Sequence, residues 1–183
     1  VGLGNENVKN RVFNKYKNLG MFDTGIIATE ALTGYLFENG QAQTAFDLLS
    51  SDKETSFAYM ARNGATTIWE NWSGRDSRNH PMFGAATKYI FMYLLGIMQP
   101  KNSYGYEKVV ISPMFVDGMN FAKGHITTEK GIVSVEYTKK DSNATVKVFA
   151  DPKIKAVFDC CGICEEFSGE KEIKLSLGAY EIK

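Results

Sequence analysis

Glu70 stands between Trp69 and Trp72, the only two tryptophans of the chain, and His80 follows a short distance downstream. Indole faces match the apolar C–H faces of a sugar ring, and they would exclude water around the carboxylate. Partial desolvation raises the pKa of a carboxylate towards working pH and makes it a better base. The pattern therefore predicts one side of a glycosidase site, where a carboxylate acts beside aromatic walls.

A structural interpretation of the same residues competes with this one. The Trp-Glu-x-Trp pattern also fits a surface strand with two half-buried rings, and perturbed carboxylates are often structural. His80 precedes Pro81, so it could equally be a turn residue that caps a helix. However, residues 73–80 are almost wholly polar and return to an apolar helix, which is typical of a binding loop.

Several segments of the chain resemble bacterial α-L-rhamnosidases of glycoside hydrolase family 78. The central one is Gly-Ala-Thr-Thr-Ile-Trp-Glu-x-Trp at residues 64–72, followed by Asn-His-x-x-Phe-Gly-Ala at residues 79–85. Shorter similarities lie at residues 24–29, 36–40, 45–49, 93–97, 105–106 and 111–113. The resemblance covers most of the chain, and its central motif is the most specific part.

The resemblance implies a fold and a domain division. Members of that family are large multidomain enzymes with an (α/α)6 barrel, and the helical segments before residue 98 are too few to close one. The resemblance therefore implies a C-terminal fragment of α+β class. We expect residues 1–99 to be the last helices of an incomplete (α/α)6 barrel and residues 100–183 to be a small antiparallel β-sandwich domain. A first residue other than Met and the lack of a signal-peptide pattern fit an excised piece.

The resemblance also implies a mechanism and a set of roles. Such enzymes invert configuration, with a carboxylic acid and a carboxylate base about 6.5–9.5 Å apart. Glu70 matches the general base, and His80 matches a residue that hydrogen-bonds rhamnose hydroxyls. Trp69, Trp72 and Asn79 would complete the substrate-binding side. The family's acid-bearing motif is not found in this sequence, so the isolated chain is expected to be inactive without the remainder of its parent.

Hydrophobic periodicity divides the chain near Pro100. Apolar residues recur at helical spacing in five upstream segments, and the second of these should stop at Asn39-Gly40. The spacer that carries Trp69 is rich in β-formers and is predicted to be extended. Downstream the period becomes two, which is typical of a β-sandwich. The helices are predicted near 8–16, 26–37, 42–49, 57–60 and 83–94, and the strands at 108–111, 131–137, 144–149, 153–158 and 171–177.

Composition excludes several classes of partner. Lys+Arg and Asp+Glu both number 21, so there is no excess of basic residues for nucleic acid. No apolar run approaches the roughly 18 residues of a membrane span. A rhamnose-containing carbohydrate is the expected partner, no cofactor is expected, and an apolar surface left by the missing barrel should favour self-association. Localisation stays open among periplasm, exterior and cytoplasm.

Two further interpretations remain open. Cys160, Cys161 and Cys164 include a C-x-x-C spacing, but no second Cys or His pair completes a tetrahedral zinc site, so no metal is expected. The β-rich half could be a carbohydrate-binding or structural module, and its scattered aromatics favour a structural cap. The helical half could instead belong to another (α/α)6 glycosidase, such as a glucosidase or a trehalase relative.

Overall fold

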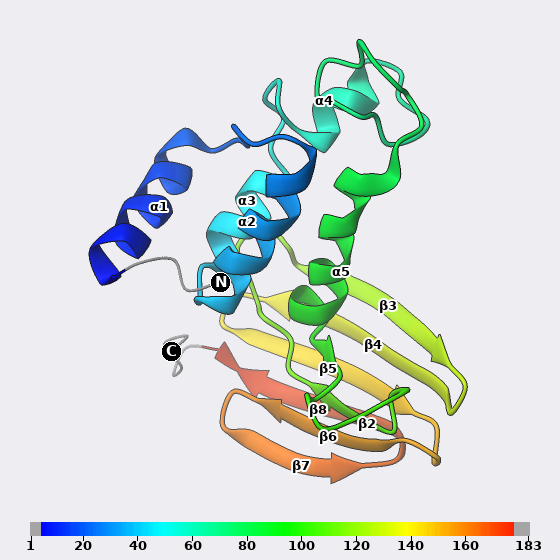
Figure 1. The fold of residues 1–183 in the computed structure, drawn as a ribbon. Coiled ribbons are helices and arrows are strands. Elements are labelled where there is room, and N and C mark those ends of the chain that lie inside the picture. The colour runs from blue at the N-terminus through cyan, green and yellow to red at the C-terminus, as the bar shows by residue number, and fades with distance from the viewer. Residues whose placement is uncertain (1–4, 178–183) are drawn as a thin grey trace. The chain divides into compact units, whose positions relative to one another are not determined.

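The computed structural model describes residues 5–177, with helices in the first half of the chain and strands in the second (Figure 1). This order confirms the predicted α+β class. The chain divides into two compact units, of which the first ends at Thr87 and the second begins at Lys88. The predicted assignment of residues 1–99 to a barrel and 100–183 to a sandwich remains a prediction about domains, and the break between compact units lies upstream of it.

The first unit contains the helices that the periodicity predicts. They are α1 (Glu6–Leu19), α2 (Ile26–Glu38), α3 (Ala42–Leu49) and α4 (Phe57–Arg62). Local capping sets several of their ends. The Asn5 side chain accepts a hydrogen bond from the Val8 N–H, and the Ser56 hydroxyl accepts one from the Tyr59 N–H. Gly20 caps the C-terminus of α1, and its φ of 61° lies in the left-handed region that favours glycine.

Helix α2 is apolar on most of its circumference. Leu36 and Phe37 are fully buried, and so are two threonines, Thr29 and Thr33. The Thr33 hydroxyl donates to the Thr29 carbonyl at 2.7 Å, so its burial leaves no unpaired hydroxyl. α2 packs against α3 and against the 3₁₀ helix η1 (Pro81–Ala86). A helix that is buried on several sides is the central support of this unit.

One local prediction was wrong. The helix predicted over 83–94 is instead three short pieces: η1, one α-turn α5 (Thr87–Tyr89) and the π-helical η2 (Ile90–Leu94). The Leu95 N–H donates to the Ile90 carbonyl at 2.9 Å, a five-residue spacing that widens the last turn. The spacer at 66–69, which was predicted to be extended rather than helical, contains no helix and consists of bends and irregular backbone.

The second unit consists mainly of two four-stranded sheets. One sheet has the order β1-β2-β6-β7 and the other the order β3-β4-β5-β8. All neighbours are antiparallel except β2 and β6, which are parallel. The strands are β1 (Ile97–Met98), β2 (Lys108–Ile111), β3 (Phe121–Thr128), β4 (Gly131–Lys140), β5 (Asn143–Ala150), β6 (Lys155–Cys160), β7 (Ile163–Phe167) and β8 (Gly169–Ser176).

The core of this unit lies between the two sheets. Ile111 and Phe158 of one sheet belong to the same buried cluster as Val133, Tyr137 and Val146 of the other. This arrangement confirms the predicted sandwich and five of its strands. β1, β3 and β7 were missed, since β1 has two residues, β3 buries only one side chain fully and β7 buries none fully. Their pairing to longer strands, rather than their own apolar pattern, holds them in place.

The same core explains why the compact unit begins before the predicted linker. Leu95 and Ile97 are buried in the cluster between the sheets, so the segment that follows η2 belongs with the strands. Gly96 lies between them with a φ of 76°, and a Cβ at that position would approach the Pro113 backbone to 2.2 Å. The chain therefore enters the β unit through a close backbone contact that only glycine permits.

Candidate functional site

Glu70 and His80 are brought together by a loop that folds back on itself. The Glu70 N–H donates to the Ser77 carbonyl at 2.8 Å, and the His80 N–H donates to the Ile68 carbonyl at 2.7 Å. The Thr67 hydroxyl adds a hydrogen bond to the Arg78 carbonyl. These backbone links align the two limbs of the loop without forming regular strands. Glu70 and His80 therefore lie close in space although they are separated in the sequence.

The Glu70 carboxylate is accessible and held by one backbone donor. Its Oε2 accepts a hydrogen bond from the Ser77 N–H at 3.2 Å and lies 3.9 Å from Nδ1 of His80. The second distance is too long for a hydrogen bond, so the two side chains are close neighbours that do not hydrogen-bond directly. The Glu70 side chain is 42% exposed and the His80 side chain 33% exposed. Water can reach this carboxylate, contrary to the expectation that flanking indoles exclude it.

Trp69 belongs to the core beneath the loop. It is 4% exposed and clusters with Met60 and Phe83. The Arg78 guanidinium lies over its ring, 5.2 Å from the centroid. Gly74 lies so close to the same indole that a Cβ added to it would be 2.5 Å from Cε3 and Cζ3 of Trp69. A ring buried in this way cannot stack on a sugar. Trp69 instead packs against the loop and stabilises its conformation.

Trp72 ties the loop to the start of α2. Its indole N–H donates to the Thr24 carbonyl at 2.8 Å, across 48 residues of sequence. Its ring stacks on Phe22 at 5.7 Å and meets Phe83 at 4.1 Å between centroids. The expectation that both tryptophans wall in Glu70 is thus corrected. Their apolar surface is used in aromatic packing, which removes far more area from water than an exposed position beside a carboxylate would.

Asn79 lies at the exposed end of the same loop. Its N–H donates to the Ser77 hydroxyl at 3.3 Å, which also donates back to the Asn79 carbonyl at 3.4 Å. The backbone of Asn79 is thus fixed immediately before His80, on the side of the loop that faces solvent. Ser77 thus links the backbone of Asn79 to the Glu70 carboxylate, whereas the roles of Asn79, His80 and Glu70 toward a substrate stay predictions.

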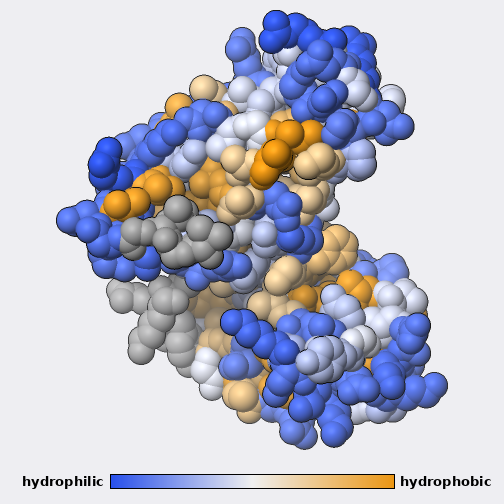
Figure 2. All heavy atoms as spheres, in the orientation of Figure 1, coloured by the Kyte–Doolittle hydropathy of each residue, from blue (hydrophilic) through white to orange (hydrophobic). Residues whose placement is uncertain are grey.

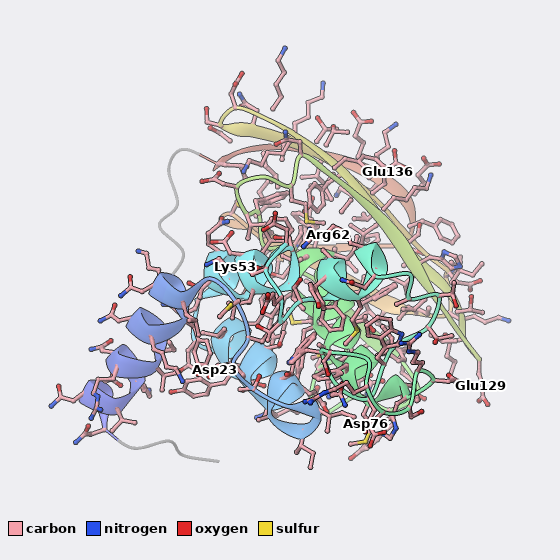
Figure 3. All side chains as sticks on the ribbon, turned by 90° about the horizontal axis from the view of Figure 1, so that it is seen from above. Asp23, Lys53, Arg62, Asp76, Glu129 and Glu136 are labelled. Carbon is pink, nitrogen blue, oxygen red and sulfur yellow. The ribbon has the colours of Figure 1, made fainter. Side chains whose placement is uncertain are left out.

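The polar residues between Glu70 and Asn79 form a network that the sequence reasoning did not single out. The Asn71 amide donates to the Asp76 carboxylate, which is labelled on this loop in Figure 3, and its oxygen accepts from the Ser73 hydroxyl. The Arg78 side chain donates to the Gly74 carbonyl at 3.1 Å. The uninterrupted polar run at 73–80 was the available signal. These contacts show that the loop is built around internal hydrogen bonds, so it can hold Glu70 in one position.

A shallow hollow of about 260 Å³ lies beside the loop. It is lined by Phe57, Met60, Ala61 and residues 65–68, and neither Glu70 nor His80 contributes to it. Its lining is mainly apolar. Among residues 5–177 no group of three or more His, Cys, Asp or Glu side chains is placed to hold a metal ion. In the same residues no helix is long and apolar enough to cross a membrane.

Comparison with known proteins identifies the family. Residues 3–94 match the family model described as the bacterial alpha-L-rhamnosidase 6 hairpin glycosidase domain, so the chain belongs to this family of glycoside hydrolases. It is 31% identical over 146 residues to an alpha-L-rhamnosidase of Alteromonas sp. (strain LOR), covering 74% of this chain and 16% of that protein. A Formosa agariphila alpha-L-rhamnosidase is 26% identical over 163 residues, which is 82% of this chain and 17% of the relative.

Solved structures agree with this assignment at the level of the fold. The alpha-L-rhamnosidase from Dictyoglumus thermophilum superposes with a TM-score of 0.72 at 25% identity, over 84% of this chain and 17% of that chain. The Streptomyces avermitilis enzyme, solved with L-rhamnose, superposes with a TM-score of 0.82 at 20% identity, over 92% of this chain and 19% of that chain. The chain thus spans about a sixth of the length of the curated relatives named above.

Proposed function

We propose that this chain works as the C-terminal portion of an inverting α-L-rhamnosidase that removes terminal α-L-rhamnose from glycosides or polysaccharides. The observation that supports this most directly is the pairing of Glu70 and His80. Within a family of rhamnosidases, an accessible carboxylate held by the Ser77 N–H lies 3.9 Å from an imidazole. A general base needs such access, because the water that it activates must reach it.

In the proposed reaction Glu70 takes a proton from water as that water attacks the anomeric carbon. The glycosidic oxygen leaves from the opposite face, where a carboxylic acid protonates it. Inversion requires the two carboxyl groups to stand about 6.5–9.5 Å apart, so that the water fits between the base and the sugar. His80 and Asn79 are proposed to hydrogen-bond rhamnose hydroxyls. Trp69 and Trp72 are proposed to contribute by holding the loop in shape.

The proposal assigns the general acid to residues outside these 183. The chain covers 16% of its Alteromonas relative. The family's acid-bearing motif is not found in the sequence of this chain. The isolated chain is therefore expected to release no rhamnose. Apolar residues reach the surface among the helices (Figure 2), with Ile27 74% and Met82 47% exposed. We propose that the remainder of the enzyme covers such surface, and that without it the chain self-associates.

The principal test replaces Glu70 by Gln in the longer enzyme that contains this chain. Gln keeps the shape and can hydrogen-bond, but it cannot accept a proton from water. We expect kcat on an aryl α-L-rhamnoside to fall by about 10²–10⁴-fold with little change in KM. Glu54→Gln is the matched control, since Glu54 is an exposed carboxylate of the same unit outside the loop. Near-parental turnover by Glu70→Gln would rule out Glu70 as the base.

A second test separates base catalysis from sugar binding. Azide offered to Glu70→Ala should restore part of the reaction, because it needs no deprotonation and attacks from the face that water used. The product would be a rhamnosyl azide of inverted configuration, identified by NMR. His80→Ala should instead raise KM as well as lower kcat, and azide should not rescue it. Retention of configuration in the product would contradict the inverting mechanism.

A further inference from the structure

The turn between β6 and β7 carries two adjacent cysteines. Cys160 is the last residue of β6 and pairs with Ile163, the first residue of β7. Cys161 and Gly162 between them have φ values of 53° and 79°. A two-residue turn with positive φ at both central positions matches the twist of an antiparallel hairpin. The backbone of both cysteines is therefore held by strand pairing and by the turn.

The two thiols face each other within this turn. Their sulfur atoms are 3.3 Å apart, and the Cys160 thiol also donates to the Pro113 carbonyl at 3.4 Å. Both cysteines are half-buried against the core of the β unit, and burial raises the pKa of the Cys160 thiol. Cys164 is exposed and pairs with Asp159, so it points to the other face of β7 from Ile163.

The separation of the sulfurs suits one bridging atom. Bonds from a thiophilic centre to sulfur are about 2.3 Å long, so a single atom can reach both Cys160 and Cys161 with little movement. A structural zinc ion would need four ligands, and no group of three or more His, Cys, Asp or Glu side chains stands ready for a metal among residues 5–177. An atom that needs only two sulfur ligands from the protein suits the Cys160–Cys161 pair.

A direct disulfide fits less well. Adjacent Cα atoms are about 3.8 Å apart across a trans peptide, whereas disulfides prefer about 4.4–6.8 Å between the Cα atoms that they join. Joining Cys160 to Cys161 would therefore strain the turn. A larger ring that includes a bridging atom avoids this constraint.

We propose that Cys160 and Cys161 form a vicinal dithiol site that captures trivalent arsenicals of the type R–As=O. The two thiols bond to arsenic in turn, and the second bond closes the ring. Two S–H bonds are replaced by two S–As bonds, and the arsenical oxygen leaves as water with both protons. Arsenic stays trivalent, so no oxidant or reductant is needed. The site is independent of Glu70 and of the proposed glycosidase function.

The experiment treats the reduced 183-residue chain with phenylarsine oxide and follows the adduct by intact mass. One arsenical should bind, survive an excess of 2-mercaptoethanol and leave on addition of dithiothreitol. The concentration of monothiol needed to release it should fall by about 100-fold or more in Cys160→Ala and Cys161→Ser, because each loses the second, intramolecular bond. Cys164→Ser should keep the parental resistance and is the matched control.

Two results would overturn the proposal. One is an adduct on the parental chain that monothiol releases as easily as it does from the single-thiol variants. The other is an adduct that depends on Cys164, which peptide mapping of the parental chain would reveal without any variant. Circular dichroism of each variant establishes that the β unit is folded, so loss of the adduct reports the thiol pair.

Discussion

The two units of this chain differ in where their apolar side chains go. In the β unit, residues from both sheets meet in one core, and fully buried side chains such as Phe158 and Val133 lie at its centre. In the helical unit, α2 is apolar on most sides, so that some of its residues are buried while Ile27 remains 74% exposed. The β unit thus contains a closed core of its own. The candidate chemistry instead lies on a loop of the unit whose apolar surface is partly open.

This contrast predicts that stability and chemistry can be changed separately. Substitutions in the β core should lower stability without touching Glu70, whereas changes in the loop at 65–80 should act on the site. The two tryptophans lie in the helical unit, so their fluorescence reports that unit selectively. Four substitutions, given in order of decreasing effect, test this separation.

The largest effect is expected from Phe158→Ala. Phe158 is fully buried between the sheets, and removing a core phenylalanine leaves a cavity that costs about 3–5 kcal/mol. Urea unfolding followed by far-UV circular dichroism should show the loss in the β unit. Phe121→Ala is the matched control, since Phe121 is 55% exposed and its loss should cost within about 0.5 kcal/mol. Equal midpoints for the two variants would contradict a closed β core.

Tyr137→Phe tests the same core through pH. Burial raises the pKa of Tyr137 to about 12, and its hydroxyl has no hydrogen-bond partner within the described part of the chain. Because the folded pKa lies above the ordinary value of 10, the folded state holds the phenol proton more tightly than the unfolded state does. The free energy of unfolding is therefore unaffected by Tyr137 ionisation below pH 10 and falls as pH rises towards 12.

The parental chain should therefore lose about 2–3 kcal/mol more than Tyr137→Phe across that range, at about 1.4 kcal/mol per pKa unit. At neutral pH the variant should be as stable as the parent or slightly more stable, because no buried hydroxyl then needs a partner. Parallel pH profiles of the two proteins in urea unfolding would show that Tyr137 does not titrate as a buried group.

Gly74→Ala should perturb the helical unit and leave the β unit alone. Gly74 has a φ of 66°, and an added Cβ would come within 2.5 Å of the Trp69 ring. Strain of this kind costs about 1–3 kcal/mol. Tryptophan fluorescence should report earlier unfolding and a changed environment for Trp69. Gly64→Ala isolates the steric part, because Gly64 has a φ of 84° with open space around it. Identical behaviour of the two variants would show that the contact with Trp69 is unimportant.

The smallest effect is expected from Lys123→Ala on the outer face of β3. Its Nζ lies 2.8 Å from the Glu136 carboxylate, labelled in Figure 3, and holds the pKa of that carboxyl below its ordinary value. Both groups are solvated, so the substitution should hardly change the unfolding midpoint at pH 7. In NMR titration the pKa of Glu136 should rise in the variant, and molar salt should raise it in the parent. A midpoint shift as large as that of Phe158→Ala would refute this ranking.

Local sequence was sufficient for the regular elements that have their own signals. The predicted stop of α2 at Asn39-Gly40 and the span of α3 agree with the structure, because capping and apolar spacing act within one or two turns. The strands with strong alternation, such as β4 and β5, were predicted for the same reason. β3 and β7 escaped prediction because their position depends on a partner strand.

The family, the α+β order and the motif that contains Glu70 and His80 can be recognised in the residues themselves. The surroundings of that motif depend on contacts that form when the chain folds. Trp69 and Trp72 read as walls around a carboxylate, yet Trp72 donates to the Thr24 carbonyl and Trp69 lies beneath Gly74. A large ring is buried wherever distant parts of the chain offer it the most contact. The Trp72 hydrogen bond joins residues 48 apart in sequence, so no local pattern can specify it.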